Sequence, residues 1–419
     1  MIVPKLRFPE FMDSKGWTEK TLEKLTEKIG DGIHTTPIYD ETGDYYFING
    51  NNLIDGIICL DEKGKRVSDD EYTKHQKGLN ENTILLSING TIGNIALYNN
   101  EKVVLGKSAC YINTSNDLEK YFLYYLIQTD KVKSYFQSEL TGSTIKNLSL
   151  KSIREAIIHF PNKIEQQKIA SCLSSLDELI AAQIQKLDVL KAHKKGLMQQ
   201  LFPAEGETMP KLRFKEFKDS GEWEEKALVN ALLTHPEYGL NAAAVPYSKN
   251  LPTYLRITDI SEDGIFIKEN KVSVEKEVTE DNYLEEGDIV LARTGASVGK
   301  SYKYRAEDGP LVFAGFLIRI RPDNLKLNSE LLYQFLSTDR FWKWVAFTSQ
   351  RSGQPGINGN EYASLQIPYP PKIKEQQKIA DCLSSLDELI TAQTKKIAAL
   401  KVHKRGLMQG LFPSPEGAV

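Results

Sequence analysis

The chain contains one 39-residue segment twice, and this repeat constrains its fold more than any other feature. EQQKIASCLSSLDELIAAQIQKLDVLKAHKKGLMQQLFP occupies 165–203, and EQQKIADCLSSLDELITAQTKKIAALKVHKRGLMQGLFP occupies 375–413. Without gaps, 29 of these 39 positions are identical. The shorter sequence PKLRF also occurs twice, at 4–8 and 210–214, each time followed by a tryptophan. The chain therefore consists of two tandem halves, as in repeat proteins.

The repeated segment predicts a long helix that pairs with its own second copy. Apolar residues alternate at three- and four-residue spacing over five heptads, which is typical of a coiled coil. Some 36 helical residues span roughly 54 Å, and an antiparallel pairing would give the molecule an approximate two-fold axis. The predicted contact positions are Ile169, Leu173, Leu176, Ile180, Gln183, Leu187 and Leu190 in the first copy, and Ile379, Leu383, Leu386, Ile390, Gln393, Ile397 and Leu400 in the second.

Both copies interrupt this apolar stripe at the same places. Gln183 and Gln393 are equivalent, and so are Lys194 and Lys404. Buried polar residues select one register and one partner orientation. The alternative is that these side chains lie at the edge of the packed zone in water. We also expect the glycines at 196 and 406 to interrupt the last turns before a closing proline.

The two regions between the helices predict β-rich domains of the α+β class. Short β-type runs alternate with Gly, Asn and Asp at 83–112 and again at 288–320. One helical stretch and a polar loop follow each region. We therefore divide the chain into a first domain, 1–158, a first helix, 159–205, a second domain, 206–368, and a second helix with a tail, 369–419. The fold is two β-rich domains joined by an antiparallel coiled coil.

Charge is distributed in the same way in both halves, although the net charge of the chain is only −3. Residues 31–71 carry ten acids and three bases, and 102–154 carry four acids and eight bases. Residues 259–288 carry eleven acids and three bases, and 300–351 carry five acids and nine bases. A local basic face attracts nucleic acid even on an acidic protein. The alternative is a mixed, solvated surface with chance clustering.

Enzymatic motifs are weak in this sequence. GASVGKS at 295–301 resembles a phosphate-binding loop, but it has three residues where that loop needs four before its GK pair. The six histidines are scattered, and the four cysteines form no CxxC pair, which predicts neither a metal site nor a disulfide framework. No apolar run reaches the roughly 18 residues of a membrane span. We expect a non-catalytic, cytoplasmic protein.

The order of these motifs resembles the DNA-specificity subunit of type I restriction–modification enzymes. The resemblance rests on PKLRF and a tryptophan at each start, the EQQKIA…LSSLDELI…LFP helices, and GSTIKNLS at 142–149. It implies that each variable domain is a target-recognition domain for one half of a bipartite, asymmetric site on double-stranded DNA. It also implies that the helices fix the spacing and dock two methyltransferase subunits, with restriction and translocase subunits in the assembly. S-adenosylmethionine, ATP and Mg would belong to those partners, and this chain would hold no cofactor.

Within such domains, two groups of residues are candidates for DNA contact. Basic side chains position the phosphate backbone, whereas amide, hydroxyl and imidazole groups in divergent loops read base edges. The candidates for phosphate binding are Lys107, Lys146, Arg293, Lys300, Lys303 and Arg351. The candidates for base reading are His34, Thr35, Thr36, Tyr238, Asn241, Gln354 and Asn358. Two other functions stay open: a coiled-coil adaptor that binds protein, and a nucleotide-binding enzyme built on GASVGKS.

Overall fold

The structure is a computed structural model that describes residues 2–142, 144 and 146–413. It divides into two compact units, one of Met1–Ile184 with Lys395–Val419 and one of Gln185–Thr394. Each unit therefore contains one β-rich domain and parts of both long helices. This division differs from the four consecutive segments that follow from the repeat alone, because each helix contributes its two ends to different units.

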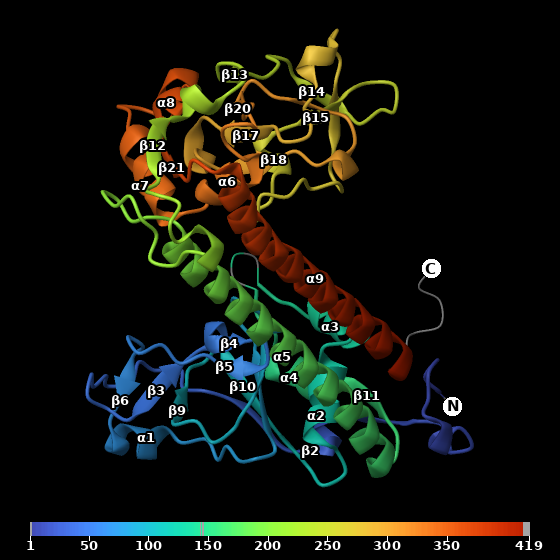
Figure 1. Ribbon diagram of the computed structural model, residues 1–419. Helices are drawn as coiled ribbons and strands as arrows, with labels where there is room; N and C mark the ends of the chain where they lie inside the picture. The colour runs from blue at the N-terminus through green and yellow to red at the C-terminus, as the bar shows by residue number, and fades with distance from the viewer. Residues whose placement is uncertain (1, 143, 145, 414–419) are drawn as a thin grey trace. The chain divides into compact units, whose positions relative to one another are not determined.

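The first unit begins with a β-rich domain (Figure 1). Its strands are β1 (Thr18–Thr21), β2 (Thr26–Asp31), β3 (Tyr45–Ile48), β4 (Leu53–Ile54), β5 (Ile57–Ile58), β6 (Arg66–Val67), β7 (Thr83–Ser87), β8 (Ile95–Leu97), β9 (Val103–Leu105), β10 (Ala109–Thr114) and β11 (Ile157–Phe160). Its helices are α1 (Asp69–His75), α2 (Lys120–Ile127), α3 (Asp130–Ser138) and α4 (Leu150–Glu155), followed by the long α5 (Lys163–Leu201).

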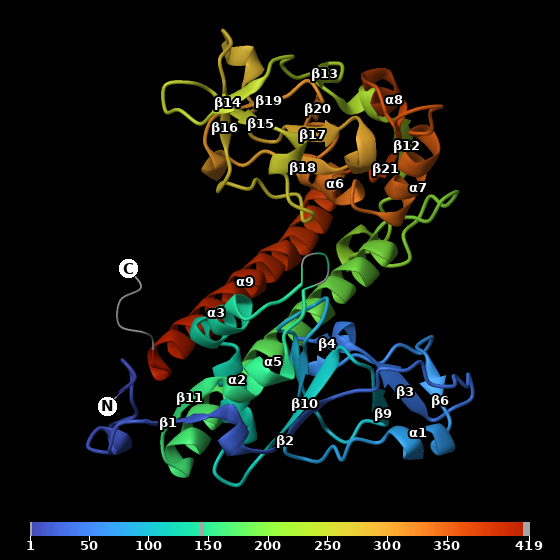
Figure 2. The ribbon, with the colours of Figure 1, turned by 180° about the vertical axis from the view of Figure 1, so that it is seen from behind.

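The second unit has a similar order of elements, without counterparts of α1 and the β4–β5 pair among its described residues (Figure 2). Its strands are β12 (Glu224–Ala227), β13 (Glu237–Tyr238), β14 (Ala244–Pro246), β15 (Thr253–Leu255), β16 (Val272–Val274), β17 (Ile289–Ala292), β18 (Ser301–Lys303), β19 (Leu311–Phe313), β20 (Leu317–Ile320) and β21 (Gln366–Tyr369). Its helices are α6 (Ser329–Phe335), α7 (Asp339–Thr348) and α8 (Gly359–Ser364), followed by the long α9 (Ile373–Leu411).

The strand pairing shows that the two domains share the topology of their main sheet. A four-stranded antiparallel sheet has the order β2-β10-β7-β8 in the first domain and β13-β20-β17-β18 in the second. A second sheet contains a parallel pair, β3 with β9 and β15 with β19. A short antiparallel pair, β1 with β11 and β12 with β21, joins the start of each domain to the strand before its long helix. The predicted α+β class is confirmed.

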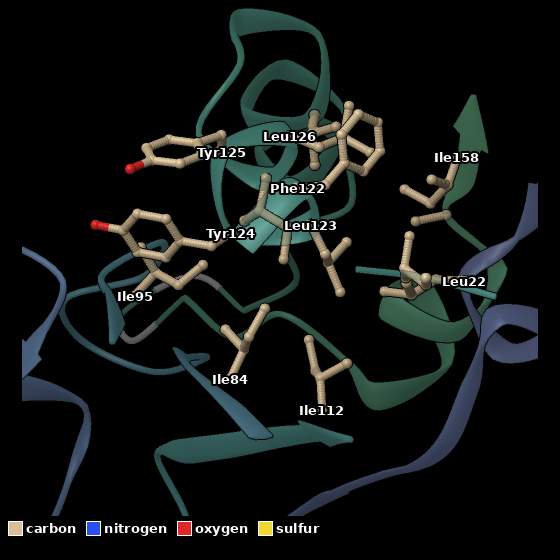
Figure 3. Close-up of a cluster of buried hydrophobic side chains, with 14 of the residues drawn as sticks. Leu22, Ile84, Ile95, Ile112, Phe122, Leu123, Tyr124, Tyr125, Leu126 and Ile158 are labelled. Atoms are coloured by element: carbon tan, nitrogen blue, oxygen red, sulfur yellow. The ribbon is translucent and has the colours of Figure 1, made fainter. Parts of the chain in front are cut away.

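The core of the first domain lies between its four-stranded sheet and α2. Figure 3 shows Phe122, Leu123 and Leu126 of α2 above Ile84 of β7 and Ile112 of β10. Helix α2 is buried on nearly all sides, so its apolar residues show no clear stripe. The helix begins where the Glu119 carboxylate accepts a hydrogen bond from the Phe122 amide at 2.5 Å.

The single helical stretch predicted after each sheet is two helices in the structure. Helices α2 and α3 are separated by Gln128 and Thr129, and α6 and α7 by a similar break. Thr338 starts α7 by accepting a hydrogen bond from the Phe341 amide at 3.3 Å. A threonine that caps a new helix is compatible with an unbroken apolar pattern, and the pattern alone therefore missed the break.

The two long helices confirm the predicted antiparallel pairing within each unit. Each helix has 39 residues, which corresponds to about 58 Å. In the first unit, Leu173 of α5 lies in one apolar cluster with Leu411 of α9. In the second unit, Leu201 of α5 lies in one cluster with Leu383 of α9. These clusters also contain domain residues such as Phe122, so each helix end packs on a domain as well as on the other helix.

The predicted contact positions are all buried or half-buried. Among the polar ones, Lys194 and Lys404 bind across the helix pair. Lys194 Nζ lies 2.7 and 2.8 Å from the Asp387 carboxylate, and Lys404 Nζ lies 2.5 and 2.7 Å from Asp177. The role in selecting register is therefore supported for the lysines, because each has one defined partner on the opposite helix.

Contrary to the expectation from the sequence, the glycines at 196 and 406 do not interrupt the long helices. Both helices continue through them to Leu201 and Leu411. A Cβ atom at either glycine would meet nothing within 4 Å. Glycine costs up to about 1 kcal/mol relative to alanine inside a helix, and the hydrogen bonds and apolar clusters of these last turns outweigh that cost. No helix in the described part of the chain combines the length and apolarity of a membrane span.

The PKLRF segments bind the first turns of the long helices through buried ion pairs. Arg7 donates to both carboxylate oxygens of Glu165, at 2.8 and 2.7 Å, and Arg213 binds Glu375 in the same way at 2.7 and 2.8 Å. The side chains of Glu165 and Glu375 are at most 1% exposed. The hydrogen bond to Glu165 raises the pKa of Arg7. A bidentate, fully paired geometry is what makes a buried charge tolerable.

The neighbouring glutamines connect the same helix turns to the domains. Gln166 accepts from the Glu119 amide at 2.9 Å and donates to the carbonyl oxygens of Asp117 and Pro161, both at 3.0 Å. Gln376 makes the equivalent set with Asn328, Lys326 and Pro370. Each EQ pair therefore joins the PKLRF segment, the domain and the long helix at one point.

These buried pairs predict a large effect on stability. Glu375→Gln leaves the Arg213 guanidinium buried without a counter-charge, and we expect it to lower the free energy of unfolding by about 3–5 kcal/mol. Asp44→Asn is the control, because the Asp44–Lys102 pair is 68% and 61% exposed and should contribute less than about 1 kcal/mol. Urea denaturation followed by tryptophan fluorescence measures both. Equal effects of the two substitutions would contradict this assignment.

Candidate nucleic-acid interface

Several loops of the second domain meet at one end of its four-stranded sheet. The Arg293 amide, after β17, donates to the carbonyl oxygen of Phe316 between β19 and β20, at 3.0 Å. The Ile357 amide of the late loop donates to the Arg293 carbonyl at 2.9 Å. The Gly315 amide donates to the Leu240 carbonyl, after β13, at 2.8 Å. These backbone hydrogen bonds fix four loops relative to one another.

The first domain builds the same end from equivalent backbone contacts. The Ile88 amide donates to Ser108 at 2.9 Å, and the Leu148 amide donates to Ile88 at 2.9 Å. The Ile33 amide donates to Leu105 at 2.7 Å, which brings the loop after β2 beside the β9–β10 turn. Position by position, Ile88 corresponds to Arg293 and Ser108 corresponds to Phe316. The scaffold is shared, and the side chains on it differ.

One glycine in each domain makes this convergence possible. A Cβ atom at Gly32 would lie 2.1 Å from the Leu105 carbonyl oxygen, and one at Gly239 would lie 2.3 Å from the Phe313 carbonyl oxygen. Real Cβ atoms do not approach backbone so closely, so only glycine fits where these two segments cross. The equivalent glycines were not singled out in the sequence, because the surrounding loops diverge.

The predicted contact residues of the first domain lie together at this end. His34, Thr35 and Thr36 follow β2 and are exposed, and His34 Nε2 lies 2.8 Å from the Asp31 carboxylate. Lys107 lies in the β9–β10 turn, and Lys146 lies in the late loop beside the strand-like contact of Asn147 with Asn89. Both lysines are exposed. Their contact with DNA stays a prediction.

The predicted base readers of the second domain also lie at its loop-bearing end. Tyr238, Asn241 and Gln354 are exposed there. The Arg293 guanidinium lies over the Tyr238 ring at 4.7 Å, and the Tyr238 hydroxyl accepts from the Gly359 amide at 2.9 Å. Asn358 is exposed as well, but its side-chain oxygen caps α8 by accepting from the Glu361 amide at 3.0 Å. This cap uses one lone pair of the oxygen and ties the side chain to α8.

The predicted phosphate-binding residues differ in their availability. Lys303 lies on β18 and binds Glu330 of α6 at 2.6 Å, away from the converging loops. Lys300 binds Glu262 at 2.8 Å, and Arg351 binds Glu361. In contrast, no carboxylate of the described residues lies within ion-pair distance of Lys107, Lys146 or Arg293.

The basic segment 300–351 is therefore not a free positive surface, contrary to the sequence analysis. Seven of its nine bases form ion pairs: Lys300, Lys303, Arg319, Arg321, Lys326, Arg340 and Arg351. Several of their partners, including Glu262 and Asp288, come from the early acidic segment. The fold brings the two charged segments of this half together, which the charge pattern along the chain does not reveal.

The loop at 295–301 is a turn between two strands. Gly295–Ser297 form a single 3-10 turn, and the next element is the strand β18, which begins at Ser301. A phosphate-binding loop instead leads into a helix whose first amides face the phosphate. The Gly295 amide is already bound to the Pro355 carbonyl at 2.9 Å. This geometry removes the support for nucleotide binding. Within the described residues, no group of three or more His, Cys, Asp and Glu side chains has a metal-binding arrangement.

Two domains with equivalent main sheets, each ending in loops of different chemistry, are typical of a protein that binds its ligand through these loops. The comparisons with known proteins agree with this class. The family model described as "Type I restriction modification DNA specificity domain" matches residues 14–192 and 247–402. The chain belongs to this family of type I specificity subunits, which are DNA-recognition components and not catalytic ones. The predicted resemblance is confirmed.

Individual relatives extend over most of the chain. The Type I restriction enzyme MjaVIII specificity subunit of Methanocaldococcus jannaschii is 26% identical over 390 residues, which cover 88% of this chain and 85% of the relative. The putative MjaX specificity subunit of the same organism is 24% identical and covers 94% of this chain and 92% of the relative. The crystal structure of a type I S subunit from M. genitalium superposes with a TM-score of 0.63 at 19% identity, covering 99% of this chain and 100% of that structure.

The ion pairs in the structure predict which lysines are available to bind phosphate. Each phosphate contact contributes a slope of about −0.9 in log affinity against log salt concentration. We expect Lys107→Ala with Lys146→Ala to weaken binding to a generic DNA duplex and to reduce the slope by about 2. Lys303→Ala should leave the slope unchanged, because Lys303 is paired with Glu330. Fluorescence anisotropy measured at about 50 to 200 mM salt distinguishes these results. An unchanged slope in the double variant would rule out both contacts.

Proposed function

We propose that this chain reads a bipartite, asymmetric site on double-stranded DNA, one half with each domain. The observation that carries this proposal is the equivalence of the two loop-bearing ends. Their backbone hydrogen bonds match, yet Arg293, Tyr238 and Phe316 stand where the first domain has Ile88, Asp31 and Ser108. Different side chains on one scaffold favour two different half-sites, because base edges are distinguished by donor and acceptor pattern.

The long helices support a fixed spacing between these half-sites. Both helices contribute residues to both compact units. Lys194 with Asp387 and Lys404 with Asp177 tie the helices in one register. A change in register would break both ion pairs and displace the apolar contact positions. These contacts within each unit support the proposal that the helices, and not a flexible linker, set the spacing of the half-sites.

Two methyltransferase subunits are the partners that we propose for the helices, with restriction and translocase subunits in the larger assembly. The helices expose apolar side chains that the helix pair does not use. Leu179 and Leu389, which are equivalent in the repeat, are 42% and 55% exposed. Equivalent apolar positions on two equivalent helices would offer two copies of one subunit the same contact. The methyl donor S-adenosylmethionine, ATP and Mg would then be bound by partners and not by this chain.

Co-expression with the cognate methyltransferase subunit and genome-wide mapping of methylated adenines tests this function. We expect one bipartite motif with unlike halves and a constant spacer. His34→Ala should relax one half of the motif, and Gln354→Ala should relax the other, because a lost base contact costs about 1–3 kcal/mol of discrimination. Lys303→Ala is a control, since Lys303 pairs with Glu330 and lies opposite Ile289, at the end of the β17–β18 pair away from the converging loops. A continuous motif, or a variant that alters both halves, would contradict the assignment.

A further inference from the structure

Phe316 has a large apolar side chain that is exposed to solvent on the second domain. It lies in the turn between β19 and β20, and 64% of it is exposed. Its carbonyl oxygen accepts from the Arg293 amide at 3.0 Å, and the Leu317 amide after it donates to Ala314 at 2.8 Å. The Gly315 amide before it donates to Leu240 at 2.8 Å. The backbone on both sides is fixed, so the ring is presented outward by a rigid turn.

The surroundings of Phe316 combine a second aromatic ring with an unpaired cation. Arg293 lies over the Tyr238 ring at 4.7 Å, and its Nη1 atom lies 3.5 Å from the Gly315 carbonyl oxygen. Its Nε atom is buried and has no hydrogen-bond partner among the described residues. Tyr238 is 49% exposed. A cation stacked on one exposed ring, with a second exposed ring on the adjoining turn, is suited to bases whose phosphates lie close by.

The first domain shows that the scaffold does not require this aromatic group. Ser108 occupies the position of Phe316, and its carbonyl oxygen accepts from the Ile88 amide at 2.9 Å, as that of Phe316 does from Arg293. Asp31 stands in place of Tyr238, since Cys110 pairs with Asp31 as Ile318 pairs with Tyr238. The same turn therefore forms around a small hydroxyl. The exposed ring of the second domain must have another role.

We propose that Phe316 inserts between two base pairs of the half-site read by the second domain and unstacks that step. Apolar side chains that enter the base stack kink the duplex, and flexible pyrimidine–purine steps deform most easily. Arg293 would bind a phosphate or base edge next to the opened step, and Tyr238 would keep the arginine in place. This inference rests on the proposed function and adds a mode of reading. The second half-site is recognised partly through deformability, and the first through direct contacts alone.

The test uses the complex of the full chain with its methyltransferase subunits and the duplex identified by methylation mapping. Single 2-aminopurine substitutions along both half-sites report unstacking as increased fluorescence. We expect an increase at one step of one half-site, separate from the increase at the methylated adenines, which methyltransferases extrude. Phe316→Ser, which installs the first domain's residue, should abolish the first signal and retain the second. Affinity should fall about 10- to 100-fold, as on loss of a base-stacking aromatic side chain.

Matched variants separate insertion from other roles of the ring. Phe316→Leu keeps an apolar wedge and should retain most of the signal. The inference is overturned if Phe316→Ser keeps the signal, or if the wild-type complex shows none outside the methylated adenines. It is also overturned if Phe316→Ser weakens only the binding of the methyltransferase, which would mark a protein contact. A wild-type complex that binds the mapped duplex no better than a scrambled one would overturn the proposed function itself.

Discussion

The buried pair of an arginine and a glutamate at the start of each long helix determines how the rest of this molecule assembles. Glu165 and Glu375 accept two hydrogen bonds each from arginines that lie 158 and 162 residues earlier in the chain. The next residue, Gln166 or Gln376, binds the segment that leads into α2 or α6. A charge this deeply buried is stable only with its partner in place. The PKLRF segment, the domain and the helix must therefore come together as one cooperative arrangement.

The last turn of each long helix contacts the PKLRF segment of the other repeat. The Leu212 amide donates to the Gln200 carbonyl near the end of α5, and the Leu6 amide donates to the Gly410 carbonyl near the end of α9, both at 2.9 Å. The first contact joins segments that are continuous in sequence, whereas the second joins the two ends of the chain. Each PKLRF segment thus lies between the end of one long helix and the start of the other. Neither unit has a complete core without both helices, which explains why the helices are the best-preserved part of the repeat.

The sequence predicted those features that depend on local periodicity and on the repeat. The helix bounds, the apolar contact positions and the β-rich class follow from spacing that a reader can count. The sequence did not show that Lys303 pairs with Glu330 or that Arg319 pairs with Glu237, because these partners meet only through the strand pairing. For the same reason it suggested that the basic segment 300–351 is free, whereas seven of its nine bases form ion pairs. Phe316 was overlooked because an apolar residue in a β-type run is normally buried, and only the turn geometry shows that it is exposed.

The loop-bearing ends show how one scaffold can carry two specificities. Some positions that differ, such as Asp31 and Tyr238, contribute backbone groups to a strand pair and have side chains that are at least partly exposed. Because the hydrogen bonds that fix the loops use the backbone, a change of side chain at these positions leaves the scaffold intact. The glycines at 32 and 239 lie where two segments cross and cannot vary in this way. The exposed side chains at this end can therefore change, and the specificity with them. The backbone beneath them and the long helices are fixed by packing.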